Sequence, residues 1–151
     1  MKTIKDKIFG DMEYDDSWVK REKVTILNRE INLCIVAECY SDQEILDIQR
    51  EAYVQYNDHF EEYSKKVPEV LLNYYKENFD MISEEFDIPE QLSLENVTED
   101  LIVKLIGVTN LYIDREGQFG WLCDCAWEEE HGLCILLSGN EPSVEEYDYL
   151  L

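Results

Sequence analysis

Basic residues are scarce in this sequence. Lysine and arginine together number 13, against 35 aspartates and glutamates, and the formal net charge at pH 7 is -22. A surface with this charge repels the phosphates of nucleic acids and the anionic headgroups of membranes. We therefore expect neither direct nucleic-acid binding nor association with a membrane.

Long hydrophobic runs are also missing. No apolar stretch approaches the roughly 18 to 20 residues that a membrane-spanning helix needs. Charged residues interrupt the first seven positions, so we expect no secretory signal. The five cysteines are odd in number and lie inside apolar runs, whereas a disulfide framework uses an even set in loops. We predict reduced thiols in a cytoplasmic protein.

The composition is nevertheless that of a folded protein. Hydrophobic residues make up 45% of the chain and aromatic residues 12%, which a disordered acidic tail does not have. A chain of this length can bury about two thirds of its unfolded surface, so we predict one domain over residues 1–151. The predicted elements are an N-terminal β meander at residues 7–38, helices at 42–86, a short helix at 98–105 and C-terminal strands at 110–138.

This order, strands then helices then strands, predicts an α+β fold. We expect a largely antiparallel sheet with two long amphipathic helices packed on one face. The expected N-terminal strands are Ile8–Tyr14, Trp18–Leu27 with a break near Arg21, and Ile31–Ala37. The expected C-terminal strands are Asn110–Asp114, Gly120–Trp127 and Leu133–Leu137.

Capping signals set the expected helix boundaries. The capping-box pattern at residues 41–44 predicts the start of the first helix, and Thr98 is the expected cap of the short one. Because proline is tolerated in a first helical turn, Pro68 predicts a break near Lys66 and a second helix to about Glu85. The apolar stripe of the first helix is Ile45, Ile48, Ala52, Tyr56, Phe60 and Tyr63.

Reactive side chains concentrate between positions 123 and 134. A tetrahedral zinc site could use Cys123, Cys125, His131 and Cys134. However, a Cys-x-Cys pair on a strand points both thiols to one face without the loop that lets a pair clasp one ion. We therefore favour buried thiols that pack beside tryptophan, and expect neither a metal nor a cofactor.

An acid–base role for the same segment would use His131 with Glu128 or Glu130, because a neighbouring carboxylate raises the pKa of an imidazole and orients it. The sequence shows no adjacent nucleophile, glycine-rich phosphate loop or metalloprotease helix. The simpler interpretation is a turn in which Gly132 adopts a positive φ and its polar neighbours bond to the turn backbone. We predict a protein that is not an enzyme, with a small-ligand or catalytic cleft around His131 as the alternative.

Negative charge is concentrated toward the C-terminus. Residues 77–151 hold 19 acidic residues and only two basic ones, Lys104 and Arg115. This pattern fits a solvated acidic surface, a docking face for a basic protein, or a mimic of nucleic acid. The candidate binding residues are Asp124, Trp127, Glu128, Glu129, Glu130, His131, Glu145, Glu146 and Tyr147.

Three short patterns carry a resemblance to a known family. They are Phe9-Gly10-x-Met12-x-Tyr14-Asp15 followed by Trp18, Ile48-Gln49-Arg50-x-Ala52-Tyr53, and Asp124-x-x-Trp127-Glu128-x-Glu130-His131-Gly132-Leu133. Over nearly its whole length the chain resembles a family of small acidic bacterial proteins of unknown function, in which Asp usually stands at the position of Glu128. By analogy, such domains are similar to immunity proteins, which neutralise toxins exchanged between bacteria. The resemblance itself implies no established reaction or ligand.

Overall fold

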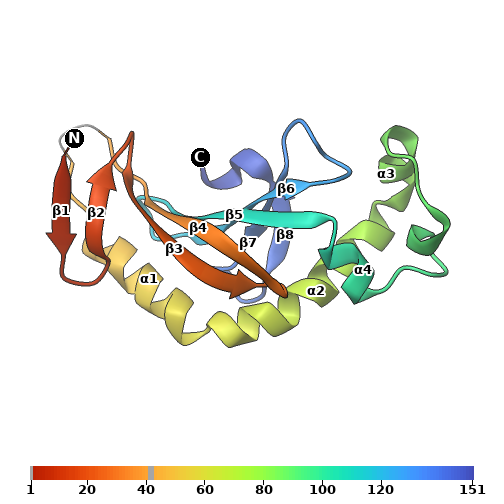
Figure 1. Cartoon of the computed structure of the whole chain (residues 1–151), viewed down its shortest axis with the longest axis horizontal. Coiled ribbons are helices and arrows are strands. Elements are labelled where there is room, and N and C mark those ends of the chain that lie inside the picture. The colour runs from red at the N-terminus through yellow and green to blue at the C-terminus, as the bar shows by residue number, and fades with distance from the viewer. Residues whose placement is uncertain (1, 41–42) are drawn as a thin grey trace.

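One sheet organises the molecule. The computed structural model describes residues 2–40 and 43–151, and within them eight strands lie side by side in chain order, from β1 to β8 (Figure 1). Every neighbouring pair is antiparallel except β4 and β5, which are parallel. The helices are inserted at this junction, because a parallel pair needs a long crossover between its strands. The combination of helices with a mostly antiparallel sheet is as predicted.

The N-terminal strands are more numerous and more regular than predicted. They are β1 (Thr3–Asp6), β2 (Gly10–Tyr14), β3 (Trp18–Ile26) and β4 (Arg29–Ala37). The expected break at Arg21 is wrong, since β3 pairs with β4 along its whole length. Between them Leu27 and Asn28 both have positive φ, the backbone of a tight hairpin turn that matches the twist of the two strands.

The helical segment divides at a different residue from the one predicted. Its helices are α1 (Asp47–Asp58), α2 (Phe60–Glu77), α3 (Phe79–Glu85) and α4 (Glu99–Val103), with a 3₁₀ turn, η1 (Glu90–Leu92), between α3 and α4. The break falls at His59, where φ is -110° and ψ is 12°, and Pro68 lies inside α2. The poor helix formers Asn57 and Asp58 precede this break, whereas the proline costs α2 one backbone hydrogen bond.

The start of α1 also differs from the prediction. Ser41 and Asp42 of the expected capping box lie outside the described residues, and α1 begins at Asp47. Ile48, expected in the apolar stripe, is 45% exposed, and Gln49 is buried in its place. The Gln49 amide donates to the backbone carbonyls of Glu38 and Ile113. The Thr98 cap is confirmed, because its hydroxyl accepts a hydrogen bond from the Leu101 amide.

The C-terminal part adds a strand and a short helix that were not predicted. Its elements are β5 (Ile106–Ile113), β6 (Phe119–Cys125), β7 (Leu133–Leu136), β8 (Ser143–Glu146) and the 3₁₀ helix η2 (Tyr147–Leu150). Alternate residues of β6 face opposite sides of the sheet. Leu122 packs with Cys134, Leu136 and Leu150 of the C-terminal segment, on the side away from Trp121.

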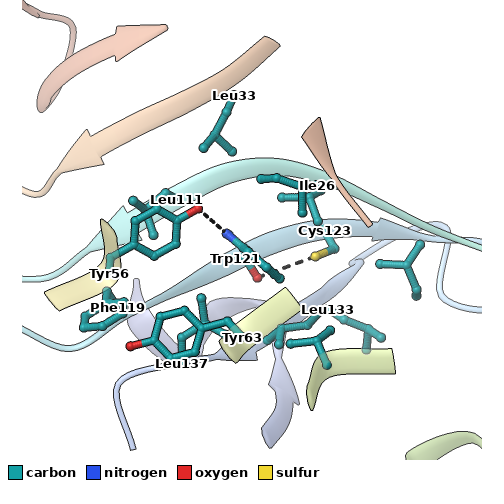
Figure 2. Close-up of a cluster of buried hydrophobic side chains, with 14 of the residues drawn as sticks. Ile26, Leu33, Tyr56, Tyr63, Leu111, Phe119, Trp121, Cys123, Leu133 and Leu137 are labelled. Atoms are coloured by element: carbon teal, nitrogen blue, oxygen red, sulfur yellow. Dashed lines mark hydrogen bonds between the residues drawn. The ribbon is translucent and has the colours of Figure 1, made fainter. Parts of the chain in front are cut away.

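Trp121, the largest of the fully buried side chains among the described residues, is at the centre of the main core (Figure 2). Its indole N–H donates to the Tyr56 hydroxyl of α1 over 3.0 Å. Phe119 of β6 contacts the rings of both Tyr56 and Tyr63, so the first two helices both pack on this strand. Buried Tyr56 has a raised pKa, because burial disfavours the phenolate. Within the described residues, no helix is long and apolar enough to cross a membrane.

Candidate functional site

The site is built around the turn at residues 126–132, which joins β6 to β7 and which we call the acidic turn. Gly132 has φ of 72°, and its amide donates to the Glu128 carbonyl over 2.8 Å. A Cβ atom at Gly132 would overlap the backbone carbonyl oxygen of Cys123. Only glycine therefore fits this position, which has the positive φ expected for Gly132 in a turn.

Trp127 fixes the acidic turn to the helices. It is only 7% exposed, and its ring lies 5.4 Å from the ring of Tyr75 in α2. The hydroxyl of Tyr75 in turn donates to the Leu92 carbonyl over 2.7 Å. Trp127 was predicted as a binding residue, but its burial makes it an anchor that holds the turn in place.

The polar side chains of the acidic turn point outward. Glu129, Glu130 and His131 are exposed and Glu128 is half-buried. The His131 Nδ1 atom lies 3.3 Å from the Glu128 carboxylate, so these side chains pair with each other and not with the turn backbone as expected. Hollows lie on both sides of the turn, and both are lined by residues 128–131.

The larger hollow, which we call the acidic groove, has a volume of about 740 Å³. The acidic turn forms one wall, and β8 with the start of η2 forms the other. Tyr74 of α2 and Met81 of α3 also line it, and neither was predicted as a site residue. The groove brings together all the predicted binding residues except Trp127: Asp124, Glu128, Glu129, Glu130, His131, Glu145, Glu146 and Tyr147.

The electrostatic character of the acidic groove is strongly negative. With Asp148 its lining holds seven carboxylates, and no lysine or arginine stands among the described residues that line it. Burial raises the pKa of Tyr74, and the charges of Glu128, Glu146 and Glu145 add to the shift. Burial likewise raises the pKa of Tyr147, with Asp124 contributing. The groove thus favours positively charged groups.

The cysteines near the acidic groove do not form one cluster. Cys123 packs in the main core, whereas Cys134 pairs with Leu122 and packs on the other face of the sheet. The thiols of Cys123, Cys125 and Cys134 are all buried, and burial raises the pKa of Cys125 and of Cys134 to about 12. The residues that the structure describes contain no group of three or more metal-binding side chains close enough to share an ion.

The serines closest in sequence to His131 are engaged elsewhere. The Ser138 hydroxyl accepts a hydrogen bond from the Phe119 amide, and the Ser143 hydroxyl donates to the Glu145 carboxylate. The side chain of His131 is 73% exposed. The arrangement is that of a charged surface with a hollow beside it, and binding is the chemistry it supports best.

The first two sequence patterns meet at the other end of the molecule. The rings of Phe9 and Tyr53 stack with centroids 4.5 Å apart. Arg50 donates from Nε and Nη2 to one carboxylate oxygen of Asp6, at 2.9 and 2.7 Å. The same carboxylate accepts the amide of Phe9 with its second oxygen. These residues attach the β1–β2 hairpin to α1, so their role is structural.

Comparison with known proteins gives one informative match. Residues 8–150 match the model of a protein family described as a domain of unknown function, DUF6985. No curated protein and no solved structure matches the chain.

Proposed function

Because the chain belongs to the DUF6985 family, whose function is unknown, we propose that it is a non-enzymatic binding domain whose acidic groove and acidic turn dock on a basic protein. The observation that carries the proposal is the convergence of seven carboxylates from β6, the acidic turn, β8 and η2 on one hollow. Keeping such like charges together costs free energy, which a cationic partner would offset.

The finer form of the proposal is an immunity-type or antitoxin-like inhibitor of a basic toxin, in the cytoplasm of a bacterium. A net charge of -22 supports it, because complementary charge accelerates association strongly at low ionic strength. We also propose that α1 and α2 together cover one face of the sheet. Contacts from Tyr56 and Tyr63 to Phe119 support that arrangement.

Salt-dependent capture tests the proposal. The tagged protein is incubated with native lysate at low salt, and mass spectrometry identifies what a high-salt wash releases. We expect a basic protein in stoichiometric amount. A double variant, Glu129→Lys with Glu130→Lys, should lose this protein, because both side chains are exposed and face the groove.

A matched variant separates the site from overall charge. Glu51→Lys with Asp58→Lys makes the same change in net charge on the exposed face of α1. The matched variant should retain the partner. Capture that survives the Glu129 and Glu130 changes, or that both double variants lose equally, would contradict the proposed docking site.

A further inference from the structure

The floor of the acidic groove is apolar, although its rim is charged. Tyr74, Leu133 and Tyr147 line it, together with Met81, which is 57% exposed. A surface that served solubility alone would need carboxylates but no hollow lined by an exposed methionine. The groove therefore offers a partner two kinds of contact at once.

Lysine and arginine side chains match this combination, because each has an apolar stem and a charged head. We infer that the acidic groove receives an extended segment of the basic partner, with a long basic side chain lying over Met81 and Tyr74. The charged head then reaches the carboxylates at the rim, among them Glu128 and Glu145. This inference rests on the proposed function and adds the kind of segment that the site recognises.

The size of the hollow favours an extended segment over a flat protein surface. Its volume of about 740 Å³ lies within the range of roughly 300–1,000 Å³ that is typical of ligand-binding clefts. The hollow lies between the acidic turn and the β8–η2 wall, so a flat surface would bridge the rim and leave the floor unfilled. A single chain in extended conformation can enter it.

Both walls of the groove are held in place before any partner binds. Trp127 packs on Tyr75 behind the acidic turn, and Gly132 lies against the strand that carries Cys123. The ring of Tyr147 lies close enough that a Cβ atom at Gly132 would be 3.0 Å from its Cδ2 atom. A preformed groove spares a binding segment part of the cost of ordering the site.

The test uses two fluorescent octapeptides. One alternates arginine with glycine, and the other replaces arginine with 2,4-diaminobutyric acid, which has a short stem and the same charge. Because only the arginine stems can cover the floor, we expect the arginine peptide to bind about fivefold tighter or more. Equal affinity of the two peptides, or no binding of the arginine peptide at low salt, would overturn the inference.

Methionine methyl NMR locates the bound peptide. The chain has three methionines, of which Met81 lies in the groove and Met12 is 1% exposed in the core. We expect the Met81 methyl resonance to shift on saturation with the arginine peptide, while the Met12 resonance stays in place. An unmoved Met81 resonance at saturation would also overturn the inference.

A variant at Met81 separates this inference from the proposed function. Met81→Ser should remove the preference for arginine over the short analogue and leave a weaker, salt-dependent binding. If the preference persists in this variant, the floor has no role and the inference fails, although salt-dependent capture of a basic protein would still stand. If the peptides behave as expected but lysate yields no basic partner, the proposed function fails while the chemistry of the groove stands.

Discussion

Replacing Gly132 with alanine tests the central structural argument about the acidic turn. Two costs act at this position. Alanine at a φ of 72° is strained by about 1–2 kcal/mol. In addition, the new Cβ atom overlaps the Cys123 carbonyl oxygen, which belongs to a buried strand and cannot move aside without disturbing β6. We expect a total loss of about 3–5 kcal/mol in the free energy of unfolding.

Gly10 supplies a matched control within the same chain. Its φ is 82°, but a Cβ atom there would meet nothing within 4 Å. Gly10→Ala therefore carries the backbone cost alone, which the lower entropy of the unfolded alanine chain partly offsets. We expect a net loss of about 1 kcal/mol. The difference between the two variants measures the overlap at Gly132.

Urea denaturation, followed by tryptophan fluorescence and by circular dichroism, measures both losses. At an m value of about 1–3 kcal/mol/M, the expected loss for Gly132→Ala moves the midpoint by about 1 M or more. The slope should stay unchanged in both variants, so that the midpoints can be compared directly. If Gly132→Ala destabilises the protein no more than Gly10→Ala, the close approach of Gly132 to Cys123 is refuted.

Two further predictions concern titrating groups. Burial raises the pKa of Asp6, but Arg50 and the amides of Phe9 and Ile8 outweigh this effect and hold the pKa below its ordinary value. Because its pKa is lower in the folded state, ionised Asp6 stabilises the protein above pH 3.8, and the protein loses this stabilisation as the pH falls further. Asp6→Asn should therefore cost about 1.5–3 kcal/mol at pH 7, measured by urea titration, and a difference that does not shrink in acid would contradict the Asp6–Arg50 pair. Among the five thiols only Cys34 is half-exposed, so a thiol reagent at pH 8 should label it first and label the other four only after denaturation. Labelling of Cys123 at a rate comparable to that of Cys34 would contradict the buried core.

Local signals predicted the elements with strong periodicity. Strand β4 and the Thr98 cap depend on residues close together in sequence, so their patterns were readable. β1 was missed because Thr3–Asp6 is short and Ile4 is its only apolar residue, so it shows no alternation of apolar and polar positions. The helix break was misplaced because the prediction relied on Pro68 and not on the weak helix formers that precede His59. These errors come from short or competing local preferences.

At the candidate site, the features that the sequence could not predict are those that depend on long-range contacts. The carboxylates of the acidic groove could be listed from sequence, but Tyr74 and Met81 join them only because the helices fold back on the acidic turn. Gln49 is a similar case, since one of its hydrogen-bond partners is the carbonyl of Ile113, in a distant strand. No local pattern distinguishes such a buried glutamine from an exposed one. The packing of Trp127 could not be predicted for the same reason, because its partner is Tyr75 in α2.

The single parallel junction of the sheet has a consequence for the way the chain folds. Each antiparallel neighbour follows its partner directly along the chain, so β1–β4 and β5–β8 can each form through local contacts. The β4–β5 pairing, which joins Cys34–Ala37 to Asn110–Ile113, closes a loop that contains the whole helical segment. Closing such a loop costs entropy before its contacts form, and it slows folding. We therefore expect the two meanders to form first and their pairing along β4 and β5 to be the slow step that completes the sheet.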